Sequence, residues 1–103
     1  MRDVFHEGKS MVGLSSVFKE MGEKMKDLDA VAMYQDSHDF NRSLYLLNDW
    51  RAQMAQTALV LTARGIPIVY YGGEQGLKGK DDDQSRELMF ESFDRQAPMY
   101  KFI

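Results

Sequence analysis

The sequence lacks cysteine altogether, so the chain forms no disulfide and no thiolate metal site. It has no apolar run near the roughly 20 residues that a membrane-spanning helix needs. Its net charge of −3 gives no general attraction to nucleic acid. The sequence contains no apolar core of a signal peptide, no repeat of solenoid period and no low-complexity linker. A length of 103 residues predicts one domain at most. The absences described above mean that neither a membrane nor a nucleic acid is an expected partner.

A short apolar run, Ala30–Tyr34, leads directly into a polar stretch that contains Asp36, His38, Asp39 and Arg42. A continuous apolar run is typical of a parallel strand that is covered on both faces. In open α/β sheets and in (β/α)₈ barrels, binding and catalytic sites lie where such strands end. The pattern therefore predicts a buried strand over residues 30–35 with chemistry at its carboxyl end.

A helix and a second strand are predicted next. Apolar residues recur at helical spacing over Trp50–Ala63, Asn48 or Asp49 serves as the N-cap, and Gly65 ends the helix in the left-handed conformation. Residues Ile66–Tyr71 then have the composition of another buried strand. A strand–helix–strand crossover makes the two strands parallel.

The flanking segments predict further helices. Ser10 is the expected N-cap of a helix whose apolar stripe consists of Met11, Leu14, Phe18, Met21 and Met25. Asp81–Asp83 lie in an expected polar loop, Arg86–Phe93 in a short helical turn, and Pro98 near the start of a last helix. The order helix, strand, helix, strand, broken helix is typical of a segment of an α/β protein with a parallel sheet. Because the final apolar pattern has no cap, we expect the chain to be truncated.

Residues Tyr34–Arg42 resemble the fourth signature region of the α-amylase family, glycoside hydrolase family 13. His38, Asp39 and Arg42 match that region. Ser37 stands in place of its usual Asn, and Phe40-Asn41 in place of its Asn-Pro pair.

Two further segments carry the same resemblance. Gly65–Gly76 resembles the last barrel strand of the family, which usually reads Gly-Ile-Pro, apolar residues, Tyr, Gly, Gln and Glu. Asp82 and Arg86 resemble a loop that borders the sugar site in fungal-type members. The resemblance covers nearly the whole chain, and it is specific because both strand motifs occur together, one barrel helix apart.

The resemblance implies that residues 1–103 are part of a glycoside hydrolase catalytic domain, a fragment of a (β/α)₈ TIM barrel. The fragment would contain helix six, strand seven, helix seven, strand eight and the start of helix eight. The family's nucleophilic Asp on strand four and general-acid Glu on strand five lie outside this chain. The calcium ligands of many members lie upstream, so no cofactor is expected in this chain and calcium is expected only in the complete enzyme.

The implied function is that of an α-amylase-like retaining hydrolase that cleaves α-1,4-glucosidic bonds of an α-glucan or maltooligosaccharide. Retaining hydrolysis uses two carboxyl groups about 5–5.5 Å apart. A third carboxylate contributes where its hydrogen bonds to the sugar strengthen in the transition state. By resemblance Asp39 is that stabiliser, and His38, Arg42, Asp82 and Arg86 bind substrate. The chain alone should be inactive and should need the remainder of the barrel; a secreted or extracytoplasmic location agrees with the resemblance.

Other interpretations of the same residues remain open at this point. Asp39 is also a plausible cap for the following loop, and a His-Asp pair often only fixes an imidazole tautomer. His38 and Asp39 together with Asp36 would offer a metal three ligands. Asp82 and Arg86 would otherwise pair with each other. For the protein as a whole, the substitutions in the fourth region leave open a non-catalytic amylase-like interaction module.

Overall fold

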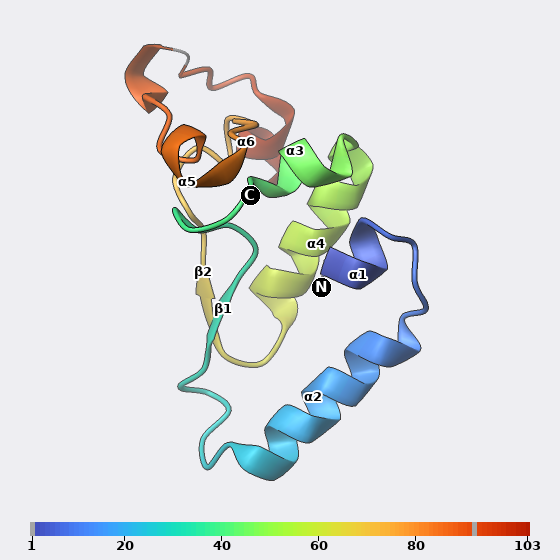
Figure 1. The fold of residues 1–103 in the computed structure, drawn as a ribbon. Coiled ribbons are helices and arrows are strands. Elements are labelled where there is room, and N and C mark those ends of the chain that lie inside the picture. The colour runs from blue at the N-terminus through green and yellow to red at the C-terminus, as the bar shows by residue number, and fades with distance from the viewer. Residues whose placement is uncertain (1, 92) are drawn as a thin grey trace.

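The computed structural model describes residues 2–91 and 93–103 as a small α/β structure (Figure 1). Its elements in chain order are α1 (Arg2–Phe5), α2 (Val12–Lys24), β1 (Ala32–Tyr34), α3 (Ser43–Leu47), α4 (Trp50–Thr62), β2 (Ile66–Ile68), α5 (Asp81–Gln84), the 3₁₀ turn Met89–Glu91 and α6 (Pro98–Phe102).

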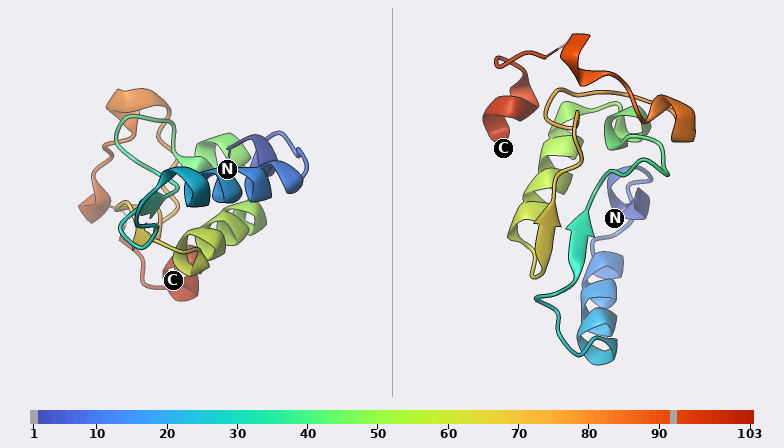
Figure 2. Two further views of the ribbon diagram at one scale, coloured as in Figure 1. Left: turned by 90° about the horizontal axis from the view of Figure 1, so that it is seen from below. Right: turned by 90° about the vertical axis from the view of Figure 1, so that its left-hand side faces the viewer.

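The two strands form a parallel pair in which Ala32 is opposite Ile66 and Tyr34 is opposite Ile68. Helix α4 connects them and contacts both strands. Figure 2 shows both strands running in the same direction, with the segments that follow them at the same end. The predicted strand–helix–strand unit is therefore confirmed, and the polar loop after β1 lies beside the glycine-rich loop after β2.

Both strands are shorter and more exposed than the sequence predicts. Each has three residues, and only Met33 among them is buried. Ile66 and Ile68 are 52% and 44% exposed, so the prediction of two buried strands is wrong for this chain. The physical reason is that a two-stranded sheet has few neighbours, and in the described residues α4 alone packs closely on both strands.

Helix α2 begins at Val12, one residue later than a Ser10 cap would place it, although the Ser10 hydroxyl accepts the Val12 N–H at 3.2 Å. Of the predicted apolar stripe only Leu14 is fully buried, and Met11 and Met25 are 57% and 48% exposed. The middle of the stripe faces β1 across a shallow apolar groove. The helix is thus where the periodicity predicts it, but fewer residues of its apolar stripe are buried than the sequence predicts.

Helix α4 has the expected start but a different buried face. The Asp49 carboxylate accepts the Arg51 N–H at 2.8 Å, as an N-cap does. Its fully buried side chains are Gln53, Gln56, Thr57 and Val60 rather than the apolar positions at 50, 54, 58 and 61. Two of these polar groups bond to the loops after the strands: Gln53 donates to the carbonyl of Gly73 at 3.4 Å, and the Thr57 hydroxyl donates to Oε1 of Gln35 at 2.8 Å.

Gly65 does not end α4 in the left-handed helical conformation, because Ala63 is the C-cap and Gly65 has φ +131°. A Cβ at Gly65 would lie 2.5 Å from the Val31 carbonyl oxygen and 2.9 Å from Met33 Cγ. The glycine is therefore required by close contact with the segment leading into β1.

Three local predictions concern the remaining turns. Asp81–Asp83 form the first turn of α5 instead of a loop, where three carboxylates favour a helix N-terminus. Helical geometry within Arg86–Phe93 is confined to the 3₁₀ turn Met89–Glu91, and residue 92 lies outside the described residues. Pro98 occupies the first turn of α6, as predicted.

Candidate functional site

The loop after β1 is held by a carboxylate that caps the next helix. Asp36 is 4% exposed, and its Oδ1 accepts the backbone N–H of Ser43 at 2.6 Å. The Ser43 hydroxyl in turn donates to the carbonyl of Gln35 at 3.2 Å. Asp36 thereby satisfies a donor at the start of α3. The capping role that the sequence left open for Asp39 belongs to Asp36 in this structure.

His38 and Asp39 lie together at the carboxyl end of β1. His38 Nε2 is 3.0 Å from Asp39 Oδ1, and the two side chains are 56% and 59% exposed. The Asp39 backbone N–H donates to the Ser37 hydroxyl at 3.2 Å. An exposed pair of this kind contributes little to folding stability. Both side chains are therefore accessible to a ligand.

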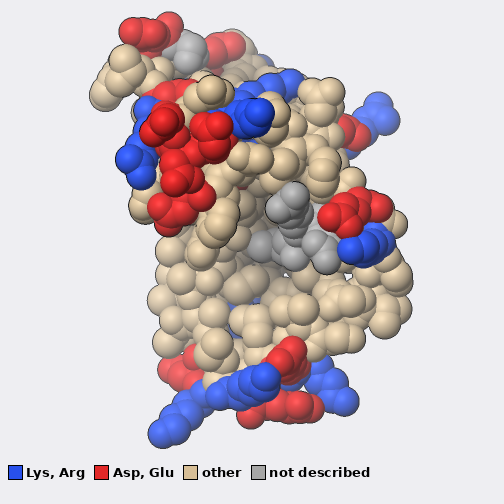
Figure 3. All heavy atoms as spheres, viewed as in Figure 1, with Lys and Arg blue, Asp and Glu red and all other residues tan. Residues whose placement is uncertain are grey.

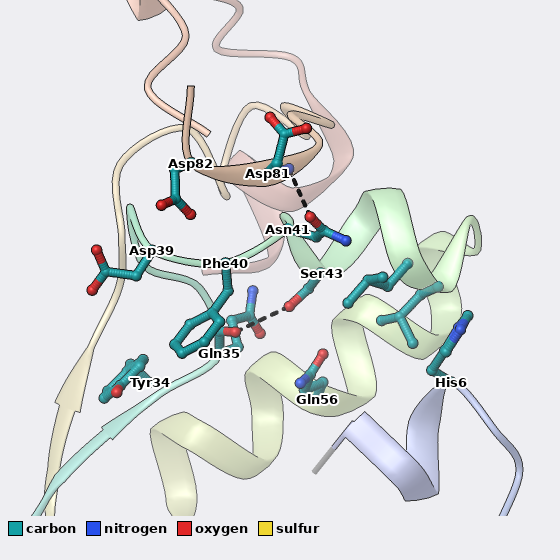
Figure 4. Close-up of a pocket in the computed structure, with 12 residues that line it drawn as sticks. His6, Tyr34, Gln35, Asp39, Phe40, Asn41, Ser43, Gln56, Asp81 and Asp82 are labelled. Atoms are coloured by element: carbon teal, nitrogen blue, oxygen red, sulfur yellow. Dashed lines mark hydrogen bonds between the residues drawn. The ribbon is translucent and has the colours of Figure 1, made fainter. Parts of the chain in front are cut away.

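A cavity of about 470 Å³ opens beside Asp39, within the size range of small-molecule sites. Its lining comes from the segments around α1, β1, α3, α4 and α5 and comprises His6, Tyr34, Gln35, Asp39, Phe40, Asn41, Ser43, Leu46, Leu47, Gln56, Asp81 and Asp82. Figure 4 shows Asp39, Asp81 and Asp82 along the upper left of this group and His6 on its right. The ring of Phe40 points away from Asp81 and Asp82, on the side of Tyr34 and Gln35.

Arg42 is outside the described cavity lining and joins the loops that follow the two strands. It is 0% exposed; Nε donates to Glu87 Oε2 at 3.1 Å and Nη1 to the Tyr71 carbonyl at 2.5 Å. Its guanidinium carbon lies 4.6 Å and 5.0 Å from the ring centroids of Tyr70 and Tyr71. The buried Arg42 side chain therefore links the loop after β1 to Tyr71 and Glu87.

Tyr70 packs edge-to-face on Tyr71, with ring centroids 4.8 Å apart. Its hydroxyl donates to the carbonyl of Ser85 at 3.3 Å. Partial burial raises the pKa of Tyr70 above 10.0; hydrogen bonding to Tyr71 and that residue's charge act in the same direction, and nearby Arg42 and Arg86 oppose them. These contacts use Tyr70 and Tyr71 for packing.

Three hydrogen bonds tie the loop after β1 to α5 and its approach. Asp81 N–H donates to Asn41 Oδ1 at 2.6 Å, the Ser85 hydroxyl to the Phe40 carbonyl at 2.7 Å, and Arg42 N–H to the Gly79 carbonyl at 2.9 Å. These bonds bring residues 40 positions or so apart in sequence onto one rim, and they place Asp82 in the cavity lining.

The predicted site residues thus separate into groups. Asp39 and Asp82 line the cavity, and His38 is paired with Asp39. Arg42 is buried, and Arg86 is exposed without belonging to the described lining. Within the described residues, Asp82 and Arg86 form no ion pair.

Sequence reasoning missed several lining residues, chiefly Tyr34, Phe40 and Gln56. The position of Phe40 directly after Asp39 is a signal that would have found it. Nothing in the sequence marks Gln56, because its place on the buried face of α4 depends on how that helix packs.

The rim of the cavity is acidic, and Figure 3 shows red carboxylate side chains gathered over α5. No cluster of three or more His, Asp or Glu suited to a metal occurs within residues 2–91 and 93–103. The combination of His38, Asp39 and Asp36 is not assembled, since the Asp36 carboxylate is buried on Ser43. None of the described helices is long and apolar enough to cross a bilayer.

Comparison with known proteins gives a consistent result. Residues 6–99 match the protein family described as "Alpha amylase, catalytic domain". A cyclomaltodextrin glucanotransferase of Paenibacillus macerans is 32% identical over 104 residues, covering 100% of this chain and 14% of that protein. An α-amylase of Saccharomycopsis fibuligera is 31% identical over 91 residues, covering 87% of this chain and 18% of that protein.

The structure superposes on that of an α-amylase from Malbranchea cinnamomea with a TM-score of 0.93 at 28% identity, covering 97% of this chain and 22% of the other. The chain therefore spans less than a quarter of the length of each of these three proteins.

Proposed function

The chain belongs to the α-amylase family of glycoside hydrolases, and from that membership we propose that it forms part of a retaining enzyme that cleaves α-1,4-glucosidic bonds in α-glucans. The observation that carries the proposal is the exposed His38–Asp39 pair, 3.0 Å apart, at the carboxyl end of a parallel strand. That end is where barrel enzymes place their catalytic side chains.

In the proposed enzyme this chain contributes one section of a (β/α)₈ barrel. Helix α2 would be barrel helix six, β1 strand seven, α4 helix seven, β2 strand eight and α6 the start of helix eight. Residues 1–103 would then be part of the catalytic domain, and the remaining strands would cover the exposed Ile66 and Ile68. The parallel order of β1 and β2 and the packing of α4 on both strands support this placement.

Asp39 is proposed as the carboxylate that stabilises the transition state. As positive charge develops on the sugar ring, hydrogen bonds from the sugar hydroxyls to an anionic carboxylate strengthen, and only such a differential gain lowers the reaction barrier. His38 would hold the Asp39 carboxylate through Nε2 and form a hydrogen bond with a sugar hydroxyl at its other ring nitrogen. The exposure of both groups supports these roles.

The other predicted residues take more distant roles in the proposal. Asp82, on the cavity lining, would accept hydrogen bonds from a neighbouring sugar, and Arg86 would approach the same sugar from outside. Arg42 would position the loop that carries Asp39, because its guanidinium joins that loop to Glu87 and Tyr71.

The nucleophile, the general acid and any calcium ligands of the proposed enzyme would come from segments outside this chain. Without the nucleophile and the general acid, the chain alone should not hydrolyse glucans. We also propose a secreted or extracytoplasmic location for the complete enzyme.

The test is hydrolysis of maltohexaose by the complete protein, followed by proton NMR of the first products. A retaining mechanism releases the α-anomer first, before mutarotation. Initial release of the β-anomer would contradict the mechanism, and absence of hydrolysis would favour a non-catalytic interaction module.

A further inference from the structure

Asp39 lies in a part of the chain that is neither helix nor strand. β1 ends at Tyr34 and α3 begins at Ser43, and residues 35–42 between them contain no regular element. The Asp39 side chain is 59% exposed and pairs with His38, which is 56% exposed. Neither the sheet nor a buried partner of its side chain fixes the carboxylate, so its position depends on what holds the neighbouring backbone.

Ser85 makes the hydrogen bond nearest to Asp39 that reaches a distant segment of the described chain. The Asp39 N–H donates to the adjacent Ser37 hydroxyl at 3.2 Å, which is a local contact. Directly after Asp39, the carbonyl of Phe40 accepts the Ser85 hydroxyl at 2.7 Å across 45 residues of sequence. Among the described residues this hydroxyl is the one donor to that carbonyl. Its removal would therefore free the peptide that follows Asp39.

Ser85 is itself held on both sides of its side chain. It is 0% exposed, and its N–H donates to the Asp81 carbonyl at 3.0 Å at the end of α5. Its own carbonyl accepts the Tyr70 hydroxyl at 3.3 Å, from the segment that follows β2. The guanidinium carbon of Arg42 lies 4.6 Å from the centroid of that tyrosine ring. A hydroxyl on so well-packed a residue can fix the loop that it contacts.

We propose that Ser85 is a positioning residue for Asp39: its hydroxyl holds the Phe40 peptide, and through that peptide the Asp39 carboxylate, at the carboxyl end of β1. The inference rests on the proposed glucan-cleaving function and deepens it by naming a residue that acts without touching substrate. Ser85 lies outside the described cavity lining, so its effect passes through the loop that carries Asp39.

The proposed role of Asp39 makes its placement important for the rate. A reacting group that is misplaced by about 1 Å can lose up to about 10²-fold in rate. Hydrogen bonds that strengthen only in the transition state act on kcat, whereas contacts made equally before and during the reaction act on KM. Loss of the Ser85 hydroxyl should therefore lower kcat more than it raises KM.

The experiment is a double-mutant cycle on maltohexaose hydrolysis by the complete protein, with Ser85→Ala, Asp39→Asn and both together. Ser85→Ala should lower kcat about tenfold and leave KM within about threefold. In the Asp39→Asn background the same change should alter kcat less than about twofold, because the carboxylate that Ser85 positions is already absent. The matched control is Ser16→Ala, which removes a hydroxyl that donates to the Val12 carbonyl at 3.0 Å in α2 and should not change kcat.

A merely structural Ser85 would lower the thermal unfolding midpoint and leave kcat unchanged at an assay temperature below that midpoint, and this result overturns the inference. An equal loss of kcat in both backgrounds also overturns it, since Ser85 would then act independently of Asp39. If Ser85→Ala is unfolded at the assay temperature, Ser85→Cys, with nearly the same shape and a weaker donor, replaces it in the cycle. A wild type without hydrolysis overturns the proposed function and the inference together, whereas either contrary result with an active wild type overturns the inference alone.

Discussion

The guanidinium of Arg42, fully buried, donates from Nε to Oε2 of Glu87 at 3.1 Å across 45 residues of sequence. Glu87 also accepts the Lys78 backbone N–H on its other oxygen at 3.0 Å. One carboxylate therefore holds both the arginine behind Asp39 and the loop that follows β2. The rim of the candidate site depends on this pair although neither residue lines the cavity.

Replacing Glu87 by Gln in the complete protein should lower the free energy of unfolding by about 1–3 kcal/mol, because the buried Arg42 charge loses its counter-charge. Denaturant unfolding followed by circular dichroism measures this. Glu20→Gln is the matched control: it removes the exposed partner of Lys24 and should change the free energy by less than about 0.5 kcal/mol. Equal effects of the two substitutions would contradict the role of Glu87.

Two glycines make a second matched comparison. Gly76 has φ +72°, and a Cβ there would overlap the ring of Trp50. Gly13 lies in α2, and a Cβ added there would meet nothing within 4 Å. Gly76→Ala should therefore destabilise the protein by more than about 1 kcal/mol.

Gly13→Ala should stabilise it by about 0.5–1 kcal/mol, because alanine is the better helix former. Thermal unfolding of both variants checks the pair. A neutral Gly76→Ala would show that the Trp50 ring does not pack against this turn.

The raised pKa of Tyr70 predicts that the free energy of unfolding falls at alkaline pH. Burial raises its pKa in the folded state above 10.0, so the folded protein holds the phenolic proton more tightly than the unfolded chain does. Its contribution to stability is complete below pH of about 10, the unfolded pKa, and is lost as pH rises through the folded value.

Denaturant midpoints of the wild type and Tyr70→Phe, measured between pH 8 and 11, should converge as the pH rises, since the variant has no proton to lose at this position. Parallel curves for the two proteins over this whole range would contradict the raised pKa.

The sequence was sufficient to predict the parallel strand pair and the helix that connects it. Short apolar runs, helical spacing over residues 50–63 and a cap at Asn48 or Asp49 are local signals, and the structure confirms the strand pair and the helix, with Asp49 as the cap. The predicted burial of both strands is wrong, because burial depends on neighbouring elements that the local sequence does not describe. Ile66 and Ile68 illustrate this.

The sequence predicts only the part of the candidate site that consists of His38 and Asp39. Asp39 and His38 occur as adjacent residues after an apolar run, so their place at the strand end followed from the pattern. Asp36 as the cap of α3, Arg42 as a buried link and Gln56 on the cavity wall depend on contacts between distant segments. No spacing rule encodes those contacts.

The most direct measurement of the central claim is the turnover number of Asp39→Asn in the complete protein on maltohexaose. Loss of the stabilising charge should lower kcat about 10²–10³-fold, with an unchanged unfolding midpoint because the side chain keeps its shape and is 59% exposed. Asp83→Asn, in α5 beside Asp82 and outside the described cavity lining, should retain wild-type kcat. A kcat for Asp39→Asn within about threefold of wild type would contradict the account.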